Sequence, residues 1–220
     1  MRRQVSFIEV DCVVDGQLVG RRSYTPNGIL VMEEPLRNGI VHGRKYWCSP
    51  LNGSLDFMEP YVDGKAHGIA KQYGERGKVI GTYRMVHGTG YDIWKEPDLD
   101  EDGNPSGAFH LAELNQMEDG VPHGIEWWLN PDGTLWWERS WKRGKLHGIE
   151  RMWNSSGNLR HGFPKYWIGD EKVSKRKYLK LQKVDFSCPP FRAEDNKPQR
   201  LPPPGLRMDT SPRPTSKALS

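Results

Sequence analysis

Residues 119–148 read DGVPHGIEWWLNPDGTLWWERSWKRGKLHG, which is one complete unit of a repeating pattern and the start of the next. A glycine-containing turn at 119–124 leads into a short aromatic run. A second turn, Asn130-Pro131-Asp132-Gly133, leads into another aromatic run, and 143–148 repeats the first turn. Short apolar runs bounded by Gly, Pro, Asn and Asp are typical of strands joined by tight turns. The unit is therefore predicted to be a β-hairpin.

This unit recurs along most of the chain. Copies begin near residues 15, 38, 63, 87, 119 and 143, and their first glycines are separated by 23, 25, 24, 32 and 24 residues. A fixed period in this range indicates a repeat protein, because a single hairpin is not stable alone and must stack on its neighbours. We therefore expect an all-β fold, an elongated antiparallel sheet of stacked hairpins of about 24 residues. The residues that define the repeat are Gly39, His42, Gly43, Gly64, His67, Gly68, Gly120, His123, Gly124, Gly144, His147 and Gly148.

The segments that flank the repeats differ from them in charge. From residue 170 onward there are 12 Lys and Arg against 6 Asp and Glu, which leaves 20 of the chain's 32 basic and 22 of its 28 acidic residues for 1–169. The array is thus nearly neutral and the C-terminal part is basic. We expect 1–14 to form an N-terminal capping strand, 15–168 the array, 169–188 a basic capping helix with Ser174 near its start, and 189–220 a disordered Pro-rich tail.

An acidic insertion, residues 96–106, lengthens the fourth unit. We expect it to be a looped-out tip of the array. Asp98, Asp100 and Asp102 alternate as in a calcium loop, but the glycine and the terminal Glu of an EF-hand are misplaced and no helix is expected beside them. No metal site is therefore predicted in the insertion.

The motif (D/N)-G-x-x-H-G, followed by an aromatic run and a second glycine turn, resembles the MORN repeat, and more specifically its variant in the bacterial YwqK-family antitoxins. The resemblance covers roughly residues 15–168, in five regular copies and one distorted copy. It implies an elongated sheet of stacked hairpins that serves as an interaction scaffold. It also implies the role of an antitoxin, which binds and neutralises a toxin encoded beside it.

The tryptophans are the candidate contact residues of the array. Paired tryptophans in a strand place one ring on each face, so part of the cluster is expected to be exposed. Exposed tryptophans in a concave sheet are typical anchors for a protein partner. A core role is the simpler interpretation, and a glycan or choline ligand is an alternative. The candidate partner-binding residues are Trp127, Trp128, Trp136, Trp137, Trp141 and Trp153.

The repeated histidines allow two interpretations. One period apart along a sheet, they could form a row that binds zinc or titrates together. Alternatively, each one bonds to turn backbone before a glycine that needs a positive φ. One copy in each repeat favours the second interpretation, because a catalytic site uses a single constellation.

Basic residues after the array are a second candidate interface, for nucleic acid or an anionic membrane surface. A solvated capping helix is the simpler interpretation. The residues concerned are Lys172, Lys175, Arg176, Lys177, Lys180 and Lys183.

No nucleophile–base, phosphate-binding or zinc-protease motif is present, so we expect neither an enzyme nor a cofactor or metal site. Cys12, Cys48 and Cys188 are far apart, which favours packing roles and a reducing compartment. No apolar run is long enough to span a bilayer, and the N-terminus lacks a signal-peptide pattern. The sequence therefore predicts a cytoplasmic, non-enzymatic protein-interaction module.

Overall fold

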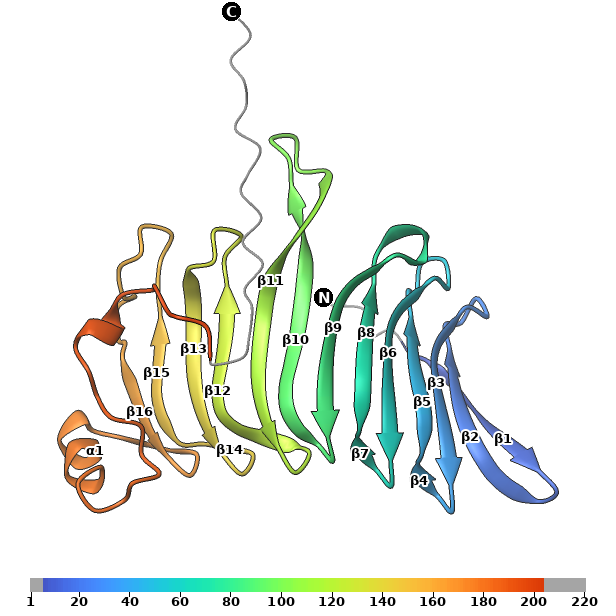
Figure 1. The fold of residues 1–220 in the computed structure, drawn as a ribbon, viewed down its shortest axis with the longest axis horizontal. Helices are drawn as coiled ribbons and strands as arrows, with labels where there is room; N and C mark the ends of the chain where they lie inside the picture. The colour runs from blue at the N-terminus through green and yellow to red at the C-terminus, as the bar shows by residue number, and fades with distance from the viewer. Residues whose placement is uncertain (1–5, 204–220) are drawn as a thin grey trace, which may run out of the picture.

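The computed structural model describes residues 6–203, in which one antiparallel sheet of seventeen strands is followed by a short helix and an extended segment (Figure 1). The predicted all-β sheet and the short C-terminal helix are thereby confirmed. The strands are β1 (Ile8–Val14), β2 (Gln17–Tyr24), β3 (Leu30–Arg37), β4 (Ile40–Val41), β5 (Gly43–Cys48), β6 (Leu55–Val62), β7 (Lys65–Ala66), β8 (Gly68–Tyr73), β9 (Val79–Val86), β10 (Thr89–Leu99), β11 (Pro105–Glu118), β12 (Val121–Leu129), β13 (Leu135–Lys142), β14 (Lys145–Leu146), β15 (Gly148–Met152), β16 (Lys165–Ile168) and β17 (Glu171–Val173). The helices are α1 (Lys175–Leu181) and the short 3-10 turns η1 (Glu75–Gly77) and η2 (Glu194–Asn196).

Long strands pair in chain order, β1 with β2 and onward to β16 with β17. The two-residue strands β4, β7 and β14 pair with the ends of β3, β6 and β13 beside the turns. Each unit thus rests on its neighbours in the sequence, as in other repeat arrays.

The first glycine turn of each unit lies at the lower edge of the sheet in Figure 1. Arg143 and Gly144 have φ of 48° and 75°, both in the left-handed region, as a type I′ hairpin turn requires. The other first turns of the repeats share this conformation, at Asp15-Gly16, Asn38-Gly39, Asp63-Gly64, His87-Gly88 and Asp119-Gly120.

The lower turns are also joined to one another. At four of them an amide donates to a carbonyl of the preceding unit at 2.7 to 3.0 Å, from Gly64 to Val41, Gly88 to Ala66, Gly120 to Gly88 and Gly144 to Pro122. Turns on the upper edge close on themselves instead, as where the amide of Asn130 donates to the carbonyl of Thr134 at 2.8 Å.

The Arg143 turn supplies a test of this geometry. Asparagine tolerates a positive φ better than arginine, and Asn-Gly is the preferred type I′ pair. We expect Arg143→Asn to raise the free energy of unfolding by about 0.5 kcal/mol in urea denaturation, since a residue with a Cβ pays about 1 kcal/mol or more in this region. Arg44→Asn, an exposed position within β5, should bring no gain. A loss of stability in Arg143→Asn would contradict the turn assignment.

The acidic insertion is not the looped-out tip that the sequence predicted. Most of it extends β10 and β11, which have 11 and 14 residues and rise above the other hairpins in Figure 1. The pairing is irregular near the tip, where Asp98 and residues 106–108 have no register partner, and the chain turns at 100–104. The Asp100 carboxylate closes this turn by accepting from the amides of Asp102 (3.0 Å) and Asn104 (2.8 Å). Local Asx bonding therefore uses the acidic residues to make a tight turn.

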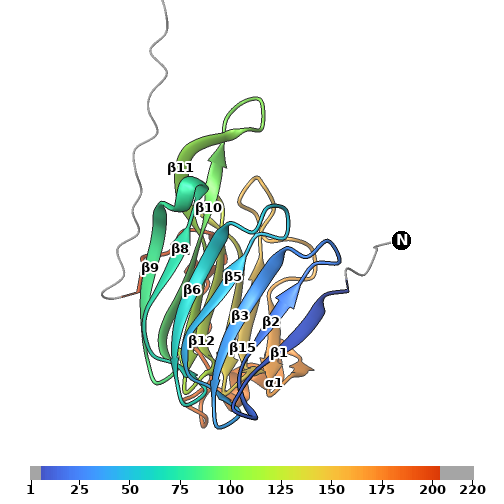
Figure 2. The same cartoon turned by 90° about the vertical axis from the view of Figure 1, so that its right-hand side faces the viewer.

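The sheet is bent, because its middle strands β8 and β9 lie on one side in Figure 2 and both ends lie on the other. The C-terminal segment follows the convex side, which we name the outer face. The opposite, concave side is the inner face. Because side chains alternate along a strand, each β-strand contributes to both faces.

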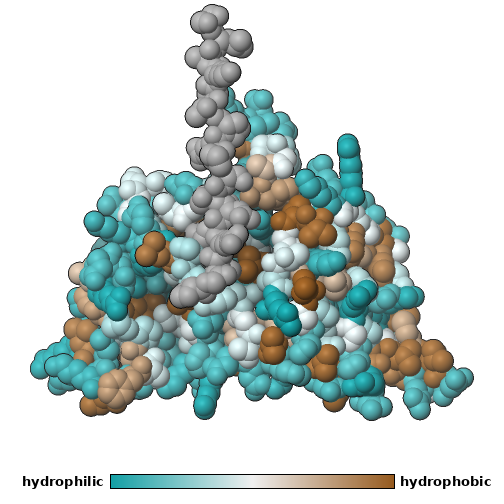
Figure 3. All heavy atoms as spheres, viewed as in Figure 1, coloured by the Kyte–Doolittle hydropathy of each residue, from teal (hydrophilic) through white to brown (hydrophobic). Residues whose placement is uncertain are grey.

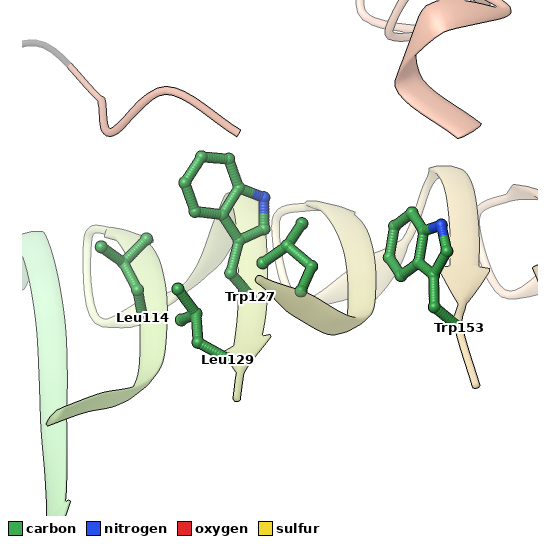
Figure 4. Close-up of a cluster of buried hydrophobic side chains, with 5 residues drawn as sticks. Leu114, Trp127, Leu129 and Trp153 are labelled. Atoms are coloured by element: carbon green, nitrogen blue, oxygen red, sulfur yellow. The ribbon is translucent and has the colours of Figure 1, made fainter. Parts of the chain in front are cut away.

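Three hydrophobic clusters hold the array together. One lies on the outer face and contains Leu114, Trp127 and Trp153, whose rings and methyl groups point toward the C-terminal segment in Figure 4. A second joins α1 to the end of the sheet, where Tyr178 packs on Tyr166 with ring centroids 5.2 Å apart. The third lies on the inner face of β6, β8 and β9 and consists of Phe57, Ala70, Tyr83 and Met85.

The expectation of a disordered tail from residue 189 is wrong for 189–203, while 204–220 lie outside the described residues. The backbone carbonyl of Asn196 accepts from Trp153 Nε1 at 2.7 Å, and that of Pro198 accepts from the amide of Leu135 at 2.9 Å. Arg200 donates to the buried Glu138 at 2.6 Å. The segment is held because it supplies acceptors and a cation to polar groups that the sheet leaves buried.

Helix α1 is shorter than the predicted 169–188, since β17 occupies part of that range. Ser174 is its N-cap, and its hydroxyl accepts from the amide of Lys177 at 3.2 Å. Elsewhere on the outer face apolar and polar residues mix, with apolar ones gathered near the β1–β2 end (Figure 3). Exposed valines of β1 and β2 include Val13, Val14 and Val19, of which the adjacent Val13 and Val14 point to opposite faces.

Candidate partner-binding surface

The structure separates the six candidate tryptophans between the two faces. Trp127 and Trp153 are 5% and 3% exposed and belong to the outer-face cluster beneath the C-terminal segment. They are core residues rather than contact residues, because strand alternation turns them away from the inner face. The partly exposed remainder, Trp128, Trp136, Trp137 and Trp141, gathers toward the inner face.

Three of these rings form a continuous aromatic surface. Trp128 lies opposite Trp137 in the β12–β13 register, and their ring centroids are 6.2 Å apart. Trp136 is the extra residue where this register shifts, and its ring lies 5.6 Å from Trp128 and 5.8 Å from Trp137. The bulge thus adds a ring that regular alternation would have placed on the other face.

A buried carboxylate, Glu126, orients the surrounding side chains. It is 5% exposed and accepts from Trp128 Nε1 at 2.9 Å and Trp141 Nε1 at 2.5 Å. Arg139 donates to it through Nε (2.8 Å) and Nη2 (2.5 Å), and its guanidinium lies 4.1 Å from the centroid of Trp137. One carboxylate therefore fixes two indoles and a bidentate arginine.

The next unit repeats this arrangement around Glu150. This carboxylate is 6% exposed and accepts from Trp137 Nε1 at 3.1 Å and from Trp167 Nε1 at 2.9 Å. Lys165 lies opposite it in the β15–β16 register, with Nζ 3.7 Å from the carboxylate. The indole N–H groups of these tryptophans thus bond to buried carboxylates, while the rings remain partly exposed.

Together these groups belong to a polar row that crosses the inner face near the middle of the strands. Most neighbouring members of the row lie directly opposite each other in the strand register or touch through their side chains. The row is therefore a series of cross-strand pairs. Its members are Glu34, Lys45, Glu59, Tyr83, Asp92, Asn115, Glu126, Arg139, Glu150 and Lys165.

Charge is unbalanced at the centre of this row. Asp92 lies near Glu59 and Glu113, and burial followed by repulsion from Glu59 raises the pKa of Asp92 to about 6. The Tyr83 hydroxyl donates to Glu59 at 2.8 Å, and hydrogen bonding of Asp92 with Tyr83 and Trp94 offsets part of the rise in the Asp92 pKa. Burial also raises the pKa of Glu113. The centre of the inner face therefore has more carboxylate than cation.

The charged members of the row were missed by the sequence analysis, although they have a periodic signal. Glu34, Glu59, Asn115 and Arg139 each lie eight residues before a repeat histidine. Lys45, Ala70, Glu126 and Glu150 each lie three residues after one. The residue type at these positions varies from copy to copy. A search for one residue type at a fixed spacing therefore does not find the row.

The repeat histidines contact the backbone of the next lower turn. Nδ1 of His42 faces the amide of Asp63 at 3.3 Å, and Nδ1 of His67 faces the amide of His87 at 3.2 Å. Nδ1 of His123 lies 3.4 Å from the amide of Arg143 and 2.8 Å from Glu118 Oε2. These contacts favour a structural role for the three histidines.

The basic residues after the array are partly engaged within the chain. Lys177 pairs with Glu171 at 3.0 Å, and Lys175 lies 4.0 Å from the centroid of Phe191. These contacts involve two of the six basic residues, so an interface for nucleic acid or a membrane at this segment stays a prediction.

No protein-family model matches the chain. In the described part, residues 6–203, no helix has the length and apolar character needed to cross a membrane.

Proposed function

We propose that the chain is a non-enzymatic protein-interaction module whose inner face binds a protein partner through Trp128, Trp136, Trp137 and Trp141. The observation that carries this proposal is the fixing of the indole rings by Glu126 and Glu150. Rings held in place lose little conformational entropy on binding, and such aromatic groups dominate binding energy at interfaces.

The shape and coverage of the inner face also support this proposal. Residues 174–203 cover the outer face near β12–β17. Among the described residues we find no segment over the four tryptophans of the inner face. Farther along, a cleft of about 1060 Å³ beside Trp94 lies at the base of the tall β10–β11 hairpin. The surplus of carboxylate near Asp92 favours a partner segment that combines apolar and cationic side chains.

We further propose that the partner is a toxin encoded beside this chain, which the chain binds and neutralises. The repeat motif supports this identity through its resemblance to the YwqK-family antitoxins. The testable form is that expression of the neighbouring gene alone arrests growth and that co-expression of this chain restores it.

The face involved can be tested in the same assay and by titration calorimetry with the purified neighbour. We expect the double variant Trp128→Ala/Trp137→Ala to weaken binding at least ~30-fold and to abolish rescue, as loss of a hot spot worth about 2 kcal/mol implies. Tyr46→Ala, which alters a partly buried aromatic residue on the opposite face of β5, should bind normally.

Three results would count against these proposals. A neighbour that is harmless and does not bind removes the antitoxin role. Full binding by the double tryptophan variant removes the inner face as the interface. Equal losses in Tyr46→Ala and the double variant would indicate general destabilisation instead.

A further inference from the structure

The side chains of His147, Asp185 and Cys188 meet where the C-terminal segment rejoins the sheet. His147 is the single residue between β14 and β15, beside a lower turn, and the other two come from the loop that follows α1. Their ligand atoms all lie within 4.8 Å of one another. Cys188 Sγ is 3.5 Å and Asp185 Oδ2 is 3.9 Å from the same atom, His147 Nε2.

Backbone contacts hold all three groups in place. The amide of His147 donates to the carbonyl of Ser140 at 2.9 Å, and the amide of Cys188 donates to the carbonyl of Asp185 at 3.1 Å. His147 and Cys188 are only 6% and 3% exposed. Two of the three groups are therefore fixed by packing, whereas the Asp185 side chain is 40% exposed and can adjust its position.

The two oxygens of Asp185 have separate surroundings. Oδ1 accepts from the amide of Ser187 at 3.0 Å and from its hydroxyl at 2.5 Å, and Lys142 Nζ lies 4.0 Å away. Oδ2 faces His147. The bonds to Oδ1 orient the carboxylate so that Oδ2 points toward His147. Hydrogen-bond partners orient metal-ligating carboxylates in the same way.

His147 differs from the other repeat histidines. His42, His67 and His123 use Nδ1 toward the next lower turn, whereas every polar contact recorded for the His147 ring is through Nε2. The following turn is also different, because Gly169-Asp170 replaces the usual order of a polar residue and then glycine. His147 therefore contacts the loop after α1 through Nε2, whereas its counterparts contact the next lower turn through Nδ1.

Convergence on one nitrogen distinguishes chelation from nucleophilic catalysis. In a Cys–His–Asp triad the acid contacts the imidazole nitrogen opposite the one that faces the nucleophile. Here thiol and carboxylate approach the same nitrogen. Burial also raises the pKa of Cys188, so the sulfur is a thiol unless a cation replaces its proton.

We propose that His147 Nε2, Asp185 Oδ2 and Cys188 Sγ form a three-ligand site for a divalent cation of the zinc class. With Zn–N and Zn–S bonds of about 2.05 and 2.3 Å, tetrahedral geometry needs about 3.6 Å between nitrogen and sulfur. The observed 3.5 Å meets this requirement. The oxygen must approach the nitrogen by about 0.5 Å, which the partly exposed Asp185 side chain allows.

Binding takes the Cys188 proton into solvent and leaves one tetrahedral position for water. Solvent reaches the cluster at Asp185, whose side chain is 40% exposed. The cation would join the loop after α1 to the lower edge of the sheet. It would thereby anchor the C-terminal segment on the outer face, independently of any partner on the inner face.

The test uses the untagged full chain, freed of metal with a chelator and titrated with Co²⁺ as a spectroscopic probe. We expect one Co²⁺ per chain, a near-ultraviolet thiolate-to-cobalt band, tetrahedral visible bands, and displacement of Co²⁺ by Zn²⁺. Cys188→Ser should abolish the thiolate band, and Cys48→Ser, a half-buried cysteine of β5, should keep it. Asp185→Asn should weaken Co²⁺ binding at least ~10-fold.

A structural readout covers the case in which Cys188→Ser does not fold. Zn²⁺ should raise the Tm of the wild type and of Cys48→Ser and slow tryptic cleavage at Arg192 and Arg200, and it should do neither in Asp185→Asn. The proposal is overturned if the thiolate band is absent, if it survives in Cys188→Ser, or if Asp185→Asn binds Co²⁺ as tightly as the wild type.

Discussion

Replacing Glu126 by alanine is expected to lower the free energy of unfolding by about 3–5 kcal/mol, which would be the largest single effect on the inner face. The carboxylate is 5% exposed and accepts from Arg139 and from the indoles of Trp128 and Trp141. Its removal leaves a guanidinium and two indole N–H groups without their acceptor. Urea denaturation of the full chain measures the loss.

Two further variants separate the buried network from ordinary charge pairing. Glu171→Ala removes an exposed carboxylate that pairs with Lys177, and it should cost less than about 1 kcal/mol. Arg139→Ala in the Glu126→Ala background should cost less than it does in the wild type, because the arginine has already lost its partner. A loss below about 1 kcal/mol in Glu126→Ala would refute the central position of this carboxylate.

Asp92→Asn is expected to stabilise the protein at neutral pH, by about 2–3 kcal/mol. The pKa of Asp92 is raised from 3.8 to about 6 in the folded chain, so folding favours the protonated form. The stability that this preference gives is fully present below the unfolded pKa and is lost as pH rises through about 6. The amide side chain of the variant keeps a neutral donor at every pH and avoids that loss.

The sign of this effect is checked by denaturation at two pH values. Asp92→Asn should exceed the wild type in stability at pH ~7.5, and the difference should shrink toward zero near pH ~4. Asp102→Asn, which changes an exposed residue of the β10–β11 turn, should match the wild type at both. A gain in Asp92→Asn of the same size at both pH values would show that the charge is not its cause.

A carboxylate that destabilises the fold at neutral pH needs another reason to be there. Binding sites commonly retain such groups at the expense of stability. Asp92 lies in the middle of the inner face, two residues from Trp94 on β10 and opposite Asn115 of β11. Its position therefore agrees with the proposed cationic feature of the partner.

The fold could be predicted because the repeat encodes it locally. Each lower turn pairs a residue at positive φ with glycine, and these turns set the period that the sequence shows directly. Strand alternation also implies that Trp127 and Trp128 point to opposite faces. Which face would be covered could not be read in the same way, because the covering contacts are distant, as between Arg200 and Glu138, 62 residues apart.

Contacts between distant residues also explain why the sequence did not indicate the proposed cation ligands. His147 and Cys188 are 41 residues apart and match no ligand spacing, and they meet only because the loop after α1 returns to the lower edge of the sheet. The tight turn at Asp100 was missed because its acidic composition suggested a loop, whereas one aspartate that bonds two amides suffices to close a hairpin.

The hydrogen bonds that join the lower turns have a consequence for how the protein can vary. Successive units are fastened to each other along one margin, while the opposite margin consists of turns that close on themselves. Additional residues can therefore be accommodated on the free margin without disturbing the spacing of the fastened one, as the tall β10–β11 hairpin shows. Extra chain there changes the height of the wall beside the inner face and leaves the width of the array unaltered.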